Sequence, residues 1–290
     1  VCLALLGGGT LLPFFWESLI ALGIAGLLVG GGYFALYIIN SNLAARYGSG
    51  PERAGNFALM HMSLSGANVV GPLVAGFGID YLGHAHTFLL LALLPVGALA
   101  LLLSGRLALV DELPPRRGDG GERGSLAELL RDPAIRPVYV MTILFALLWD
   151  TFTLLAPIKG AALDFSASRI GIVVSTFSFA SFAVRGLTPM LARRFSNWQL
   201  LLLAVSLGAG SCFLFGLSTG YAAMLIFAFG VGFGQGLGSP IGNAALFDVV
   251  PAHRSGEAMG LRTAVMMSCQ TGMPLVAGAA SSLLGVMPLF

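Results

Sequence analysis

The sequence predicts an all-α membrane protein built of two helical bundles, and three observations lead to this fold class. First, hydrophobic residues make up 57% of the 290 positions and charged residues only 10%, whereas a soluble domain has roughly 25% charged residues. Second, the chain contains nine apolar runs of about the length that a helix needs to cross a bilayer, roughly 20 residues. Third, an internal repeat relates the two ends of the chain, which predicts two similar bundles.

The nine apolar runs are predicted to be transmembrane helices, because they are too long for strands and lack two-residue alternation. They lie near residues 1–15, 18–44, 56–81, 86–106, 137–158, 168–188, 198–217, 221–247 and 257–286. The chain then divides into an N-terminal helical bundle (1–106), a linker (107–136) and a C-terminal helical bundle (137–290). The linker is rich in proline, glycine and charge. Within it, Ser125 and Glu128 form a capping-box pattern that predicts a short helix on the membrane surface.

Positive charge predicts how the chain is oriented in the membrane. If the runs alternate in direction, nearly all arginines fall on the side of the linker: Arg46, Arg53, Arg106, Arg116, Arg117, Arg123, Arg131, Arg136, Arg193, Arg194 and Arg254. The connections on the opposite side hold only Lys159 and Arg169. By the positive-inside rule, we expect a multi-pass protein of the cell membrane whose central linker is cytoplasmic.

The internal repeat is carried by a pentapeptide and by isolated residues, whose registers differ by one position. The sequence PLVAG at Pro72–Gly76 recurs at Pro274–Gly278, a shift of 202 residues, and Asn42 matches Asn243 at a shift of 201. Parallel repeats of this kind are a transporter architecture in which substrate binds where the repeats meet. Counting outward from the repeat, we expect a fragment that supplies helices three to eleven of two six-helix bundles, truncated at both ends. The alternative is a nine-helix protein with a chance match.

Several motifs carry a family resemblance. The third run resembles the fifth-helix signature G-x3-G-x3-GP-x2-GG of the drug-efflux branch of the major facilitator superfamily, and the ninth run repeats it loosely. GEAMGLR at 256–262 and RGLTPMLARRF at 185–195 also resemble cytoplasmic motifs of this superfamily. The resemblance covers essentially the whole chain. Small residues followed by a proline predict close helix packing and a kink at Gly71, Pro72, Gly76, Gly272, Pro274 and Gly278.

Two positions depart from the superfamily pattern. Ala192 stands about where an aspartate is usual, and the run at 26–34 lacks the arginine found in proton-coupled drug exporters. Export of organic compounds, which the fifth-helix resemblance favours, therefore stands beside uptake of a metabolite.

Polar residues inside the apolar runs are the candidate substrate and coupling residues. Asp150 lies thirteen residues after Pro137, or about 20 Å along a helix, and a charge at that depth costs roughly 2.5–3.5 kcal/mol. It is interpreted as a proton-coupling or cation-binding carboxylate, or else as a hydrogen-bonded structural acid. Four amides either bind substrate or hold helices together: Asn40, Asn68, Gln235 and Gln270.

A second group of charged residues is predicted near the cytoplasmic face. It comprises Arg185, Asp248, Glu257 and Arg262, together with His61, which precedes Arg262 by the repeat shift of 201. These residues form either a gate or charge network that assembles in one state of a transport cycle, or ordinary interfacial side chains that reach toward water.

Together these observations predict a secondary active transporter that moves a small solute by alternating access, and not an enzyme. We expect a monomer in the lipid bilayer with a small-molecule partner and optional proton coupling. The sequence has no nucleotide-binding motif, no metal-ligand spacing and no cofactor motif, and a net charge of +2 does not suggest nucleic acid. A carrier-fold receptor or assembly protein is the alternative from another class, and a membrane-embedded enzyme is a more distant one.

Overall fold

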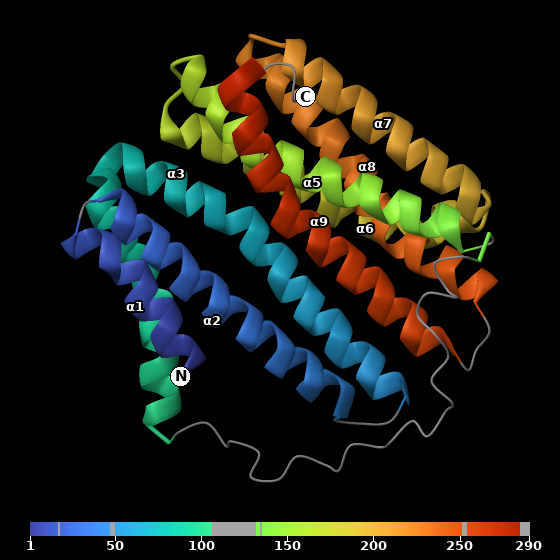
Figure 1. Cartoon of the computed structure of the whole chain (residues 1–290), viewed down its shortest axis with the longest axis horizontal. Helices are drawn as coiled ribbons and strands as arrows, with labels where there is room; N and C mark the ends of the chain where they lie inside the picture. The colour runs from blue at the N-terminus through green and yellow to red at the C-terminus, as the bar shows by residue number, and fades with distance from the viewer. Residues whose placement is uncertain (17, 47–49, 106–131, 134, 251–253, 285–290) are drawn as a thin grey trace. The chain divides into compact units, whose positions relative to one another are not determined.

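The computed structural model describes residues 1–16, 18–46, 50–105, 132–133, 135–250 and 254–284, which form helices joined by turns (Figure 1). These residues contain no strand, so the predicted all-α fold is confirmed. The helices are α1 (Cys2–Phe15), α2 (Leu19–Arg46), α3 (Gly50–Leu103), α5 (Arg136–Ala162), α6 (Ala167–Ala192), α7 (Asn197–Leu217), α8 (Tyr221–Val249) and α9 (Ser255–Leu284).

Helix α3 contains two of the predicted runs, which meet at Gly83. This residue has φ 79° and ψ 170°, a left-handed φ that glycine adopts without the steric cost of a Cβ atom. On the far side of the bend, the Thr87 hydroxyl donates to the Gly83 carbonyl oxygen at 2.7 Å, and Thr87 packs against Gly78. The predicted boundary between runs 56–81 and 86–106 therefore lies at this glycine.

Most of the helices have the length and apolar character of membrane spans. Among the described residues, six segments qualify: Leu19–Ser41, Met62–Leu103, Arg136–Ala162, Ala167–Thr188, Asn197–Leu217 and Tyr221–Asn243. Segment Cys2–Phe15 is apolar but shorter. Many large apolar side chains on these helices are exposed, which suits surfaces that face lipid.

The chain divides into two compact units, Val1–Asp119 and Gly120–Phe290. In unit 1, α1 packs against both α2 and α3. Close approach depends on small residues, because a Cβ atom at Gly9 would lie 2.9 Å from Leu28 Cβ and one at Gly32 would lie 2.9 Å from the Cys2 carbonyl oxygen. The predicted linker helix at Ser125 and Glu128 lies outside the described residues.

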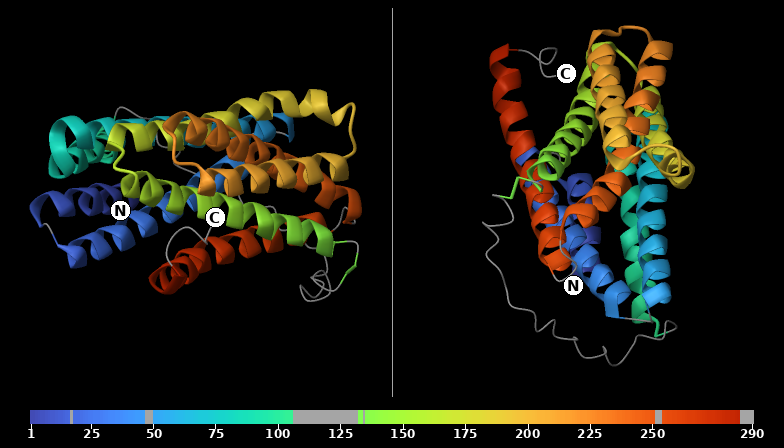
Figure 2. Two further views of the ribbon diagram at one scale, coloured as in Figure 1. Left: turned by 90° about the horizontal axis from the view of Figure 1, so that it is seen from above. Right: turned by 90° about the vertical axis from the view of Figure 1, so that its right-hand side faces the viewer.

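In unit 2, α8 packs against α5, α6 and α7, and α7 and α8 lie side by side in Figures 1 and 2. Glycines on α8 make these contacts. Gly232 and Gly236 lie against the backbone of α6, and a Cβ atom at Gly234 would lie 2.5 Å from the Ala204 carbonyl oxygen of α7. The glycine-rich run at 230–238 is therefore a packing surface, as its composition predicts.

The starts of α6 and α7 are fixed by serine caps. Ser196 accepts from the Gln199 amide at 3.3 Å while the Gln199 side chain accepts from the Ser196 amide at 3.0 Å, a complete capping box. Ser166 accepts from the Arg169 amide in the same way. These caps place the turns 163–166 and 193–196 between α5, α6 and α7.

Candidate functional site

Asp150 lies in the middle of α5, within the apolar segment Arg136–Ala162. Its side chain is half-buried, and its Oδ2 atom is buried with no hydrogen-bond partner in the part of the chain that the structure describes. A buried polar atom without a partner costs roughly 1–3 kcal/mol, and more when it carries charge. Such a group kept inside a membrane segment is a candidate for function.

Two further buried oxygens of unit 2 lack a hydrogen-bond partner among the described residues, Ser181 Oγ on α6 and Gln235 Oε1 on α8. Contacts between glycines of α8 and the neighbouring helices show how deep these residues lie in unit 2. Gly236, the neighbour of Gln235, packs on the backbone of Ser181, so these two residues lie at the same level.

Helix α5 places Asp150 close to this level. Leu148 contacts Gly208, which in turn packs against Gly234 of α8. Asp150 therefore lies two residues beyond the level of Gly234, or about 3 Å of helix rise. Because α5 runs opposite to α8, the three unpartnered oxygens come from three helices within about 6 Å of depth in unit 2.

Gln270 of α9 is at a similar depth. Helices α5 and α9 run parallel where they touch, because Tyr139 donates to the Ala258 carbonyl oxygen and Thr142 accepts from Arg262. Continuing both helices by eight residues from the second contact brings Gln270 level with Asp150. Its side chain is half-buried.

The aromatic residues around this depth divide into two groups. Phe152, Phe177 and Phe215 are fully buried and pack as a cluster, with ring centroids 4.6 Å apart for the first two. Trp149 lies at the margin of the cluster, 5.0 Å from the Phe177 ring and tilted by 59°. Phe179 and Phe182, in contrast, are exposed on α6.

Arg262 is a buried charged residue of unit 2 that donates hydrogen bonds to two other helices. It is only 8% exposed. Its Nε atom donates to Thr142 Oγ1 of α5 at 3.0 Å, and a terminal nitrogen donates to Asn243 Oδ1 of α8 at 2.6 Å. A Cβ atom at Gly242 would lie 3.2 Å from its other terminal nitrogen. Within the described residues, Arg262 thus joins three helices through neutral partners.

The other predicted members of the charged group are placed differently. Glu257 pairs with Arg254, with 3.1 Å between Oε2 and Nε, and not with Arg262. Arg185 is exposed on α6. The side chains of Asp248 and His61 lie outside what the structure describes.

Lys159, at the other end of α5, reaches the end of α7. Its Nζ atom donates to the carbonyl oxygens of Phe215, at 2.7 Å, and of Gly216, and lies 5.7 Å from the centre of the Phe215 ring. A cation at this position suits the negative end of the helix dipole. Nearby, the Arg169 guanidinium lies 5.5 Å from the centre of the Tyr221 ring.

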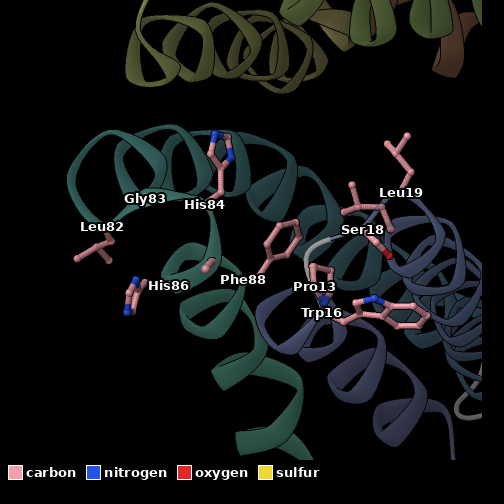
Figure 3. A pocket seen from close by; sticks show the side chains of 11 residues that line it. Pro13, Trp16, Ser18, Leu19, Leu82, Gly83, His84, His86 and Phe88 are labelled. Atoms are coloured by element: carbon pink, nitrogen blue, oxygen red, sulfur yellow. The ribbon is translucent and has the colours of Figure 1, made fainter.

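Two pockets lie in the described part of unit 1. One of them, about 740 Å³, lies where the α1–α2 turn meets the bend of α3 (Figure 3). Its lining includes Trp16, His84 and His86, and the two imidazoles point in different directions. The smaller, about 650 Å³, lies between α2 and α3, and its polar lining is Asn40, Asn56 and Ser63. Asn68 is exposed on α3.

Two of the predicted packing glycines, Gly71 of α3 and Gly272 of α9, show no close neighbour in the described residues. A Cβ atom at Gly71 or Gly272 would meet nothing within 4 Å, whereas Gly76 is buried. The side chains of Pro274 and Gly278 lie outside the description. The role of these residues in helix packing stays a prediction.

Sequence reasoning missed Thr142, Lys159 and the pocket of unit 1. Thr142 lies in a run of apolar residues and has no charge to draw notice. Lys159 stands near a predicted loop, where a lysine is ordinary. The signal for the pocket was available in the cluster of Trp16, His84 and His86 beside two predicted turns.

Comparison with known proteins agrees with this architecture. A bacterial homologue of the human lysosomal transporter Spinster, in an inward-facing and unoccupied conformation, matches with a TM-score of 0.69 at 14% identity, covering 97% of this chain and 67% of that one. The inward-facing, occupied conformation gives a TM-score of 0.68 at 14% identity, with 97% and 66% covered. The chain thus spans about two thirds of the length of these proteins.

Likeness at this identity establishes the fold, and the family follows from the sequence. A comparison with curated proteins gives no match. The family model of the Major Facilitator Superfamily, however, matches residues 1–286, which is nearly the whole chain. The helical units, the apolar spans and this match together show that the chain belongs to the Major Facilitator Superfamily.

Proposed function

We propose that this protein is a secondary active transporter that moves a small solute across the cell membrane by alternating access. Membership of the superfamily and the six apolar segments support this function. The observation that carries it is the buried Oδ2 atom of Asp150 in the middle of α5, which has no hydrogen-bond partner among the described residues. A protein that needed only to be stable would replace such a group with an apolar one, so its presence favours a role in binding or coupling.

The proposed solute and coupling residues are polar residues that stand within the apolar runs of the sequence. Asp150 is the coupling carboxylate, which takes up and releases a proton or binds a cation. Gln270, level with it, and Gln235, about three residues away in depth, offer amide groups to the solute in unit 2, as do Asn40 and Asn68 in unit 1. Export of an organic compound is the proposed direction, on the resemblance of the third apolar run to the drug-efflux signature.

The proposed gate involves the charged residues at the predicted cytoplasmic end, with the central linker on the cytoplasmic side. The Arg262 cluster supports this role because a buried guanidinium with neutral partners can gain a carboxylate partner in another state. Glu257, Asp248, Arg185 and His61 are the other proposed members. In the conformation seen here, Glu257 would then pair with Arg254, at 3.1 Å.

Flux of solute and protons in liposomes tests the proposal. The protein is reconstituted with a pH-sensitive dye inside the vesicles, and cationic drugs, sugars and organic acids are added in turn. We expect one solute class to trigger proton movement, and Asp150→Asn to abolish it while the variant stays folded.

The outcomes separate the parts of the proposal. Proton movement that survives in Asp150→Asn would keep the carrier and contradict the coupling role of Asp150. If no solute crosses the membrane, measured directly with radiolabelled compounds from each class, the carrier function is contradicted and a receptor role is favoured.

A further inference from the structure

The three partnerless atoms of unit 2 share a chemical character. Asp150 Oδ2, Ser181 Oγ and Gln235 Oε1 are all oxygens that accept hydrogen bonds. The serine hydroxyl can also donate, whereas the amide oxygen and the ionised carboxylate only accept. The missing partner of this set is therefore a donor of hydrogen bonds.

No basic side chain of the described part of unit 2 supplies that donor. Lys159 lies nine residues beyond Asp150 on α5, about 13 Å along the helix, and its ammonium is bound to the carbonyls at the end of α7. The guanidinium of Arg262 is bound to Thr142 and Asn243. Within the described residues, the Oδ2 atom of Asp150 thus has no cationic partner. An incoming cation would relieve the cost of burying the carboxylate.

The surroundings of Asp150 suit an organic cation. Trp149 precedes it and packs against the buried Phe177 ring. Its own ring is half-buried and offers aromatic surface to an apolar body and to positive charge. A hard divalent ion would need several oxygen ligands, commonly more than one carboxylate. No group of three or more His, Cys, Asp or Glu side chains in the described residues could hold one.

We propose that unit 2 binds a protonated organic amine, with its ammonium group donating to Asp150 and to Gln235 and its apolar body beside Trp149. Helices α5 and α8 run in opposite directions, so the two acceptors differ by about three residues, or about 4.5 Å, in depth. A head group with more than one N–H bond can bind both. The assignment rests on the proposed carrier function, for which it names the class of solute.

A matched ligand series tests the head group. Binding is measured by equilibrium dialysis against the protein in lipid nanodiscs, with empty nanodiscs to subtract partition into lipid. The probes carry amine, trimethylammonium, alcohol or carboxylate head groups on phenylethyl and on naphthylethyl bodies. We expect the primary amines to bind at least tenfold more tightly than the alcohols and carboxylates, and more tightly than the trimethylammonium ions, which have no N–H bond.

Variants test the assigned residues. Asp150→Asn should weaken amine binding by roughly tenfold to a hundredfold, the range for loss of a hydrogen bond to a charged group. Gln235→Leu should weaken it by roughly twofold to tenfold. The matched control is Asp164→Asn, because Asp164 is exposed in the α5–α6 turn with φ 56°, a conformation that asparagine tolerates. It should leave binding unchanged, and a thermal melt of each variant verifies folding.

Each outcome decides the assignment. Equal binding of all head groups, tighter binding of alcohols or carboxylates, or an absence of amine binding at millimolar concentration would overturn it. Amine binding that is unchanged in a folded Asp150→Asn protein would overturn the assigned site. Amine binding that depends on Asp150 without any flux would uphold the site and contradict the carrier function, whereas flux of another solute class would uphold the carrier and contradict the amine.

Discussion

The cluster around Arg262 predicts an unusual order of mutational effects. Arg262→Met removes the guanidinium and keeps an apolar stem, whereas Asn243→Leu keeps the guanidinium and removes one of its two acceptors with little change in volume. Because both partners of Arg262 are neutral, removing the acceptor should destabilise unit 2 more than removing the charge.

The magnitudes follow from the contacts that remain. In Arg262→Met, the Thr142 hydroxyl keeps its bond to the Val138 carbonyl oxygen at 2.9 Å, and only Asn243 Oδ1 loses its partner. The buried charge also disappears, so we expect a loss of about 1–2 kcal/mol. In Asn243→Leu, the guanidinium stays buried with one acceptor, and we expect a loss of about 2–4 kcal/mol.

The free energy of unfolding is measured in mixed micelles by titration with a denaturing detergent, with tryptophan fluorescence as the signal. The double variant should lose less than the sum of the single losses, with a coupling of about 0.6–1.7 kcal/mol as for other interhelical hydrogen bonds in membranes. If Arg262→Met is more destabilising than Asn243→Leu, the charge itself stabilises the fold and a carboxylate partner must exist.

Two further predictions concern the packing of unit 2. Gly234→Ala should lower the free energy of unfolding by about 1–3 kcal/mol, since its Cβ would lie 2.5 Å from a carbonyl oxygen of α7. Gly210 faces open space, so Gly210→Ala should raise the free energy of unfolding by up to about 1 kcal/mol. The same detergent titration measures both variants. Lys159→Met should speed hydrogen exchange in the α7–α8 connection, because it removes the ammonium from the carbonyls of Phe215 and Gly216; exchange that stays slow would show that the helix end needs no such support.

The positions of the helices could be predicted because hydrocarbon imposes a length on every span. Each predicted run overlaps a helix, and the break between 56–81 and 86–106 falls at Gly83, whose left-handed φ ends one helix before the other begins. The tight contacts of Gly232, Gly234 and Gly236 were also foreseeable, since three glycines at alternate positions leave a helix without side chains on more than one face.

The partners of the polar residues could not be predicted in the same way. Depth along a helix follows from counting residues, and this placed Asp150 well inside the membrane. Which side chain faces which depends on helix rotation and crossing, which the sequence does not specify. Arg262 was therefore grouped with nearby carboxylates, whereas in the structure it binds Thr142 and Asn243, residues 120 and 19 positions away.

The last prediction concerns the thermal stability of the Asp150→Asn variant. The Oδ2 atom of Asp150 has no hydrogen-bond partner in the described residues, so the folded state gains little from the carboxyl group and bears the cost of burying it. Asp150→Asn should therefore melt at the same temperature as the unaltered protein or at a higher one, even though flux and amine binding fall.

Such a separation of stability from activity is typical of residues kept for function. Thr142→Val is a suitable comparison, because Thr142 lies on the same helix and has two hydrogen bonds within unit 2; its melting temperature should fall. A clear fall in the melting temperature of Asp150→Asn, comparable with that of Thr142→Val, would mean that the carboxyl group stabilises the fold through a contact of its own. Asp150 would then be a structural acid, and neither coupling nor amine binding could be assigned to it.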